Sequence, residues 1–383
     1  MIRRRLSSRR LLLWAHLGVG LLASPVLIAV ATSGALLTAE EPVLDWTMPR
    51  VQAAPGARAL SLGEIGTRVL ARRPGVRIVS VRLGERADRP IIVQLSGATV
   101  PAIYVDPTTG AMIGVPGRAD RFFQAVRGFH RRLSAGEIGG ALVAWCTVGL
   151  LLLAVSGLVL WWPGRILGVR PGAAGWRRTI QWHQLTGAYA WVALLLFAAT
   201  GIVLHWEADA RRALGRATGV ASPAPITADA RECSGRTSLT ADQLIAEARR
   251  AMPGARATTM LVDIGAPVRV SFRYPEDRTP AGRSLVFLAS CSGRVLQRID
   301  TRSAPVSYTV PRMWTRAVHT GDVFGWPTRM IAAVGSLVVP LLGVTGLLVT
   351  VKRRPRNPAG SQCLEAPAVS LGVESRSVIR GRP

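Results

Sequence analysis

Histidine is the residue type whose spacing in this 383-residue sequence most strongly suggests chemistry. The sequence has five histidines, namely His16, His130, His183, His205 and His319. Each of four long apolar stretches holds a hydroxyl residue followed by glycine, namely Ser33-Gly34, Ser156-Gly157, Thr200-Gly201 and Thr345-Gly346. The first and third histidines precede such a pair by 17 residues, and the second and fifth precede one by 26. This repeated spacing matches His16 with His183 and His130 with His319, and it leaves His205 without a counterpart.

Two neutral imidazoles that face each other inside a helix bundle are the arrangement that holds a haem iron from both sides. If two halves of the chain are related by an axis along the membrane normal, His16 faces His183 near one surface. His130 then faces His319 near the other surface. Because ionisable groups at membrane depth are costly, they usually mark a function. We therefore expect two b-type haems, held by these two pairs, with His205 as an alternative outer ligand.

Other uses of these histidines are less consistent with the spacing. A single histidine at a membrane interface is often only an amphipathic anchor, which is the simplest interpretation of His205. Structural zinc usually takes four protein ligands, whereas each site offers two histidines. A proton relay would need further ionisable residues, and the apolar stretches contain no Asp or Glu.

Four stretches contain no charged residue apart from histidine, namely 11–37, 138–162, 185–204 and 330–351. Each provides the roughly 20 helical residues that cross a bilayer core. The first is nearly twice as long as the apolar part of a signal peptide, so we expect a retained anchor. The sequence predicts a membrane protein with four transmembrane α-helices in a duplicated two-helix arrangement and two small α+β external domains.

Arginine clusters set the predicted orientation, because short loops rich in positive charge stay in the cytoplasm. They lie before the first stretch, between the second and third, and after the fourth. The predicted order is a cytoplasmic N-terminus (1–10), helix 1 (11–37), external domain 1 (38–129), helix 2 with its lead-in (130–162), a cytoplasmic loop (163–182), helix 3 (183–206), external domain 2 (207–318), helix 4 with its lead-in (319–351) and a disordered cytoplasmic tail (352–383).

Each external region reads as one helix followed by strands, because β-branched residues alternate between Gly, Pro and Asp turns. The predicted helices cover 61–72 and 240–252, and the predicted strands cover 76–83, 91–95, 102–105, 258–263, 268–274 and 285–289. Cys233 and Cys291 both lie in the second region, where an oxidising compartment would allow a disulfide. Two free thiols are the alternative.

The composition excludes two classes of protein. Hydrophobic residues make up 49% of the chain, which is too many for a disordered protein. Lys and Arg number 48 against 22 Asp and Glu, for a formal charge of +26. No basic module interleaved with aromatic residues accompanies this charge, so nucleic-acid binding is a poor interpretation and a lipid bilayer is the expected partner.

Over residues 5–355 the sequence resembles the PepSY-associated transmembrane family. Four segments carry the resemblance: the first-helix His16, His130-Arg-Arg-Leu-Ser-Ala-Gly-Glu, His183-Gln-Leu-Thr-Gly and His319-Thr-Gly-Asp-Val-Phe-Gly. The family comprises iron-regulated proteins of the bacterial inner membrane and includes siderophore-iron reductases. The resemblance implies external PepSY modules, haem held by membrane histidines in the reductase members, and reduction of ferric siderophores in the periplasm.

The functional hypothesis is a di-haem electron-transfer protein that passes electrons from a quinol or a cytoplasmic reductase to a periplasmic ferric siderophore or other ferric chelate. The sequence has no dinucleotide or flavin motif, so another carrier must deliver the electrons, and no catalytic residue is assigned. The alternative is a non-enzymatic PepSY sensor or assembly factor that binds a peptide or partner protein. A small-solute permease is a third hypothesis, but the apolar stretches show no clear polar site at mid-membrane.

Overall fold

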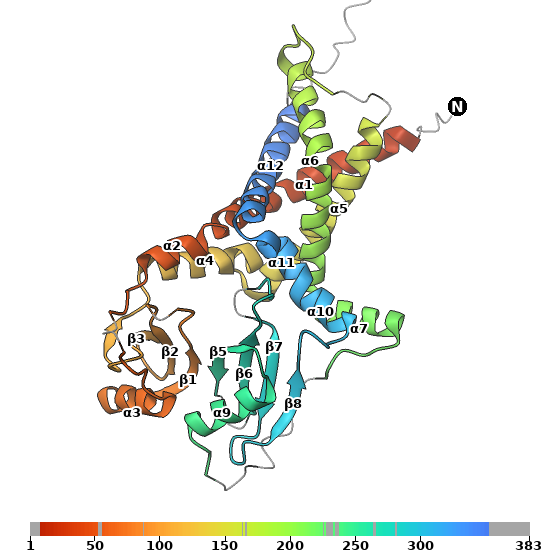
Figure 1. The fold of residues 1–383 in the computed structure, drawn as a ribbon. Helices are drawn as coiled ribbons and strands as arrows, with labels where there is room; N and C mark the ends of the chain where they lie inside the picture. Colours follow the sequence, from red (N-terminus) through yellow and green to blue (C-terminus); the bar gives the residue numbers. More distant parts are fainter. Residues whose placement is uncertain are drawn as a thin grey trace, which may run out of the picture.

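The computed structural model describes residues 8–52, 56–86, 88–162, 164, 167–224, 226, 233, 237–262, 266–279 and 282–351. The chain forms a bundle of four long helices with an antiparallel sheet at one end and short helices between the two (Figure 1). We call the end of the bundle next to the sheet the sheet side, and the opposite end the far side. The predicted cytoplasmic tail (352–383) lies outside the described residues.

The bundle consists of helices long and apolar enough to cross a membrane: α1 (Ser8–Leu37), α5 (Gly136–Trp161), α6 (Gly175–His205) and α12 (Trp326–Val351). They form a ring in which α1 contacts α5 and α12, and α6 contacts the same two helices. Helices α1 and α6 therefore lie diagonally across the bundle from each other. This arrangement decides which side chains can meet in the interior.

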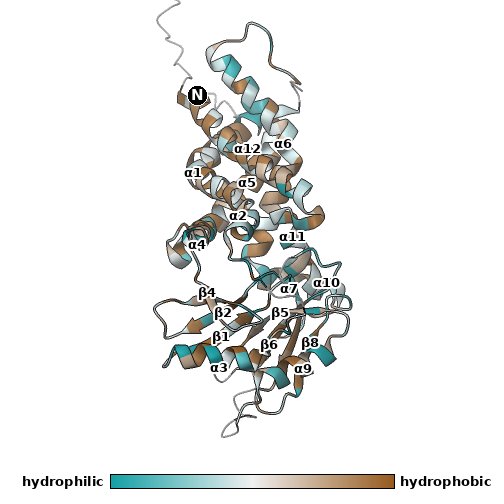
Figure 2. Cartoon of the chain, turned by 60° about the vertical axis from the view of Figure 1, so that its left-hand side comes forward, coloured by the Kyte–Doolittle hydropathy of each residue, from teal (hydrophilic) through white to brown (hydrophobic). Residues whose placement is uncertain are grey.

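Small and medium-sized residues pack the inside of the bundle, while large apolar side chains cover its outside. Ala23, Cys146 and Ala154 are buried in one cluster with Leu27, Leu194 and Val339. In contrast, Leu22 and Ile138 are each 83% exposed on the outer surface. The long helices are correspondingly apolar along their length (Figure 2). An apolar exterior of this kind suits lipid, so the chain is a multi-pass membrane protein.

All described strands belong to one eight-stranded antiparallel sheet with the order β4-β3-β2-β1-β5-β6-β7-β8. The first half of the chain supplies β1 (Arg77–Arg82), β2 (Ile91–Ser96), β3 (Ala102–Val105) and β4 (Met112–Gly114). The second half supplies β5 (Arg256–Leu261), β6 (Val268–Arg273), β7 (Ser284–Leu288) and β8 (Val295–Ile299). The two predicted external domains are therefore not separate bodies, because β1 pairs with β5, as at Val81 with Met260.

One helix from each half covers the same face of this sheet: α3 (Leu62–Arg72) and α9 (Ala241–Ala251). Each begins with a capping box, at Ser61 and Thr240, as the sequence predicts for a helix start. The carboxylate of Asp242 in α9 also accepts the backbone N–H groups of Leu62 and Gly63, at 2.8 and 3.1 Å. The two halves are thus joined by a side chain as well as by the sheet.

Short helices lie between the bundle and the sheet (Figures 1 and 2): α2 (Glu40–Thr47), α4 (Arg118–Arg132), α7 (Glu207–Thr218), α10 (Val306–Thr309), a π-helix (Val310–Trp314), α11 (Thr315–Thr320) and a 3₁₀ turn (Asp322–Phe324). The predicted lead-ins to the second and fourth spanning helices belong to separate helices. The residue that caps α4, Leu133, has a φ of 50°, and the residue that caps α11, Gly321, has a φ of 77°, so each helix stops there. Helix α4 carries five arginines, so it belongs at the surface of the bilayer and not in its core.

Candidate metal-ligating histidine pairs

The four histidines with repeated spacing come from four different helices. His16 lies on α1 and His183 on α6, both in the half of the bundle nearer the far side. His130 lies in the last turn of α4, and His319 lies in α11, both on the sheet side. The long helices position the first two directly, whereas the breaks before α5 and α12 position the other two.

The structure brings these residues together as two pairs. The ring centroids of His16 and His183 are 6.4 Å apart, with 85° between the ring planes. The centroids of His130 and His319 are 6.3 Å apart, with 56° between the planes. We call His16 and His183 the inner pair, and His130 and His319 the outer pair. The inner pair joins helices α1 and α6, which face each other across the bundle.

In the inner pair, a hydroxyl group on a neighbouring helix holds the Nδ1 atom of each imidazole. The distance from His16 Nδ1 to Ser156 Oγ is 2.8 Å, and from His183 Nδ1 to Thr345 Oγ1 it is 3.0 Å. Each hydroxyl donates its own proton to a carbonyl one turn earlier in its helix, at Leu152 for Ser156. The hydroxyl oxygen is therefore left to accept, and the Nδ1–H group must donate.

The outer pair repeats this pattern. His319 Nδ1 lies 2.8 Å from Thr200 Oγ1, and that hydroxyl donates to the Leu196 carbonyl. His130 Nδ1 donates to the Val30 carbonyl at 2.9 Å and lies 3.3 Å from Ser33 Oγ. In all four rings the hydrogen-bond network thus assigns the proton to Nδ1 and leaves the lone pair on Nε2, the state in which an imidazole binds a metal.

The glycine after each hydroxyl residue makes room for the ring. A Cβ atom placed on Gly157 would lie 3.3 Å from His16 Cε1, and one on Gly346 would lie 3.4 Å from His183 Cε1. On Gly34 it would lie 3.0 Å from His130 Cε1, and on Gly201 it would lie 3.6 Å from His319 Cε1. From sequence alone the hydroxyl-glycine pairs indicate only close helix packing, whereas these contacts make them part of the site.

The two pairs fit one metal ion each. Two imidazoles that share an ion place their centroids about 6 Å apart, because a metal–nitrogen bond is about 2 Å long and each nitrogen lies about 1 Å from its ring centroid. No group of three or more His, Cys, Asp or Glu in the described part of the chain is placed to hold a metal. A haem, which supplies four equatorial nitrogens itself and needs only two axial ligands, suits this donor set better than zinc does.

His205, the fifth histidine, is not brought to either pair. It is the last residue of α6, and its ring packs against Trp206 with the centroids 4.7 Å apart. Trp206 packs in turn against Trp145 of α5. These contacts suit an anchor at the end of a spanning helix.

The two cysteines of the second external region are joined. Cys233 and Cys291 form a disulfide whose Cα atoms are 5.4 Å apart. They are separated by 58 residues, and Cys291 follows strand β7 by three residues. Cys146 is a buried free thiol within α5 and packs in the core of the bundle.

Comparison with known proteins supports a membrane protein with spanning helices. No curated protein matches the sequence. The family described as the PepSY-associated TM region matches residues 13–353, which include both histidine pairs and all of the four spanning helices except the first five residues of α1. The chain therefore belongs to the PepSY-associated TM region family.

Proposed function

We propose that the protein binds two b-type haems, one at each histidine pair, and carries electrons across the membrane to a ferric chelate. The observation that supports this most is the fourfold repetition of one local geometry. Each ring has its Nδ1 atom held by a hydroxyl or carbonyl oxygen and its Cε1 atom against a glycine, and it has another imidazole opposite it. A merely structural histidine has no need of these features together.

The residues around each pair orient the ligands before any cofactor arrives. The hydroxyl of Ser156 or Thr345 fixes the ring plane and the proton position of its histidine, so little reorganisation accompanies binding. Buried apolar residues pack the bundle between the inner and outer pairs. A haem held in this way supplies one-electron chemistry, and the protein supplies its position and its surroundings.

The spacing of the pairs suits transfer across a bilayer. Along α1, His16 and the outer-pair partner Ser33 are 17 residues apart, and along α6 His183 and Thr200 are also 17 apart. Seventeen residues correspond to about 25 Å of helix, close to the ~30 Å thickness of the hydrocarbon core. The equal spacing and equal contacts in the two halves support a duplicated two-helix arrangement.

We infer that the far side is cytoplasmic and that the sheet lies in the periplasm of a bacterial inner membrane, with both termini cytoplasmic. Described arginines at the far side support this orientation, namely Arg9, Arg10, Arg170, Arg177 and Arg178. Electrons would then enter at the inner pair from a quinol or a cytoplasmic reductase. They would leave at the outer pair toward a ferric siderophore or another ferric chelate.

Transfer can be tested in proteoliposomes with a reductant trapped inside and ferric citrate outside. We expect ferrous iron, detected with an external chelator, to form only when the parent protein is present. The variants His16→Ala and His319→Ala should each reduce this rate to that of empty vesicles, whereas His205→Ala should keep the parent rate. Equal rates for all four proteins would contradict electron transfer and would favour a non-enzymatic PepSY sensor or assembly factor.

A further inference from the structure

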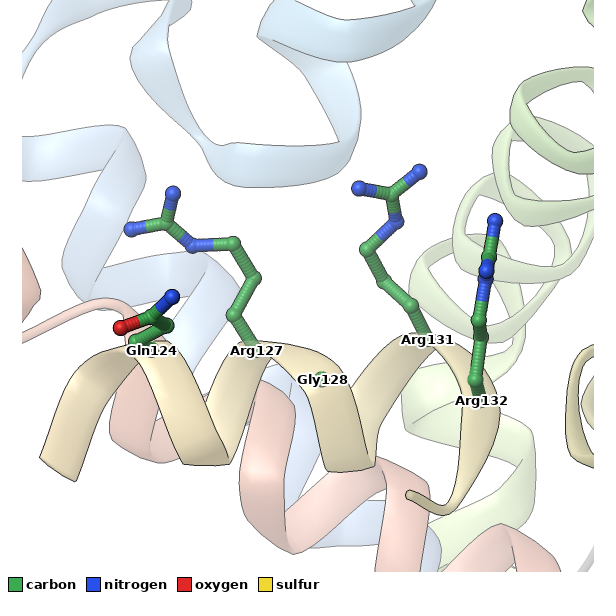
Figure 3. Close-up of a pocket in the computed structure, with 5 residues that line it drawn as sticks. All are labelled: Gln124, Arg127, Gly128, Arg131 and Arg132. Atoms are coloured by element: carbon green, nitrogen blue, oxygen red, sulfur yellow. The ribbon is translucent and has the colours of Figure 1, made fainter. Parts of the chain in front are cut away.

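Helix α4 carries a cavity of about 160 Å³ lined by Gln124, Arg127, Gly128, Arg131 and Arg132. Figure 3 shows the three arginine side chains rising from the same side of the helix. Gly128 leaves the floor open, since a Cβ atom there would meet nothing within 4 Å. A cavity needs roughly 10–15 Å³ of such volume to hold one water molecule, so this cavity has room for a polar group of several atoms.

The positive charge of this cavity is largely uncompensated. Arg127 forms an ion pair with Glu40, but Arg131 and Arg132 form no ion pair or side-chain hydrogen bond among the described residues. Burial lowers the pKa of Arg127, and the positive charges of Arg316 on α11 and of Arg131 lower it further. Four guanidinium groups therefore act together near this site, and the ion pair of the lining arginines in the described part of the chain is that of Arg127 with Glu40.

The position of two of these arginines lowers the electrostatic free-energy cost of placing like charges together. Arg131 and Arg132 lie in the last turn of α4, where the negative end of the helix dipole favours cations. This interaction with the helix dipole uses none of the guanidinium N–H groups of Arg131 and Arg132. Those groups therefore remain available to donate hydrogen bonds to a ligand. Guanidinium groups donate in a planar fork that matches carboxylate and phosphate oxygens, so an oxyanion is the ligand that this cavity fits.

The cavity lies beside the outer histidine pair. His130 falls between Arg127 and Arg131 in α4, and His319 follows Arg316 by three residues in α11. Three residues of helix rise about 4.5 Å, so an anion in the cavity lies within about one turn of the outer pair along α4. This is the end of the bundle at which, under the proposed function, electrons leave.

We propose that this cavity binds an anionic oxygen group, a carboxylate or phosphonate, carried by the ferric chelate that accepts the electron. The proposal rests on the proposed function and narrows its substrate class to chelates with anionic arms. A phospholipid headgroup offers the same chemistry at this depth, so the test must separate the two sources. The arginines act here by binding and orienting the acceptor, and they take no part in ligating a metal.

Gallium(III) citrate is a suitable probe, because gallium(III) takes the ligands of ferric iron and is not reduced under these conditions. Its binding to the full chain in phosphatidylcholine nanodiscs can be measured by calorimetry. We expect Arg131→Gln/Arg132→Gln to weaken binding at least tenfold, and Arg131→Lys/Arg132→Lys to be intermediate because it keeps the charge and loses the fork. The matched control is Arg121→Gln, which removes an α4 arginine outside the cavity and should change affinity less than twofold.

Equal affinity in the glutamine double variant and the parent would overturn the proposal. So would equally tight, arginine-dependent binding of gallium(III) in a trihydroxamate that lacks anionic arms. If nanodiscs containing phosphatidylglycerol abolish citrate binding, the cavity belongs to a lipid headgroup and the proposal fails. The probe is redox-inert, so its binding does not require electron transfer. Haem content is measured separately on the same preparations, so that a loss of citrate binding can be distinguished from a loss of haem.

Discussion

Replacing Gly157 by valine should remove the inner haem and leave the outer one. A Cβ atom at Gly157 would already lie 3.3 Å from His16 Cε1, below the ~3.5–4.0 Å of an ordinary carbon contact. The two methyl groups of valine reach about 1.5 Å further, so the ring must retreat by roughly 1 Å. The 2.8 Å bond from His16 Nδ1 to Ser156 Oγ does not survive such a movement.

This displacement should change both the stability of the bundle and its affinity for haem. Overpacking the bundle costs about 1–3 kcal/mol, which the spanning helices should tolerate. Loss of a residue that orients a metal ligand costs about 10–100-fold in metal affinity, and displacement of the ligand itself costs more. We therefore expect haem content to fall from about two to about one per chain, and one of two steps in a redox titration to disappear.

Gly149 provides the matched control, because it packs equally closely in the same helix without touching histidine. A Cβ atom there would lie 3.4 Å from Val19 and 3.5 Å from Ala23, both on α1. Gly149→Val should therefore lower the thermal midpoint about as much as Gly157→Val but keep both haems. If both variants keep two haems and unchanged potentials, His16 is not a ligand held against Gly157 and the reasoning is refuted.

Three further changes test other parts of the account. Thr345→Val removes the acceptor of His183 Nδ1, and it should lower affinity for one haem about 10–100-fold in a haem titration, whereas Thr350→Val should not. His205→Ala should keep both haems by absorbance, and loss of one would show that it is a ligand after all. Asp242→Asn weakens the cap that joins the two halves of the sheet part, so we expect about 1–3 kcal/mol of lost stability in thermal unfolding and unchanged haem content. A loss of haem in that variant would show that the sheet part supports the sites directly.

The sequence sufficed to predict the spanning helices, because uninterrupted apolar stretches of this length have few other stable environments. It also sufficed for six of the eight described strands, since alternation of β-branched residues is a local property, but β4 and β8 were not predicted. The pairing of His16 with His183 and of His130 with His319 followed from spacing alone, and the ring distances agree with it. These features depend on periodicity and length, which a single sequence displays.

Features set by contacts between distant segments were not predictable. The pairing of β1 with β5 at the centre of the sheet joins residues far apart in the chain, such as Val81 and Met260, which are 179 residues apart. Neither strand differs locally from an ordinary one. The surface helix α4 was not predicted as an element, because its residues were divided between external domain 1 and the lead-in that begins at His130. The role of the hydroxyl-glycine pairs appears only when Ser156 and His16, on different helices, are seen together.

The central claim is that each histidine pair holds one b-type haem, and haem content of the purified protein tests it most directly. A reduced-minus-oxidised absorbance spectrum with a pyridine haemochrome assay should give about two b-type haems per chain. His16→Ala and His319→Ala should each retain about one, and the double variant should retain none. Absence of haem in protein from cells supplied with iron and haem precursor, or full haem content in the double variant, would contradict the account.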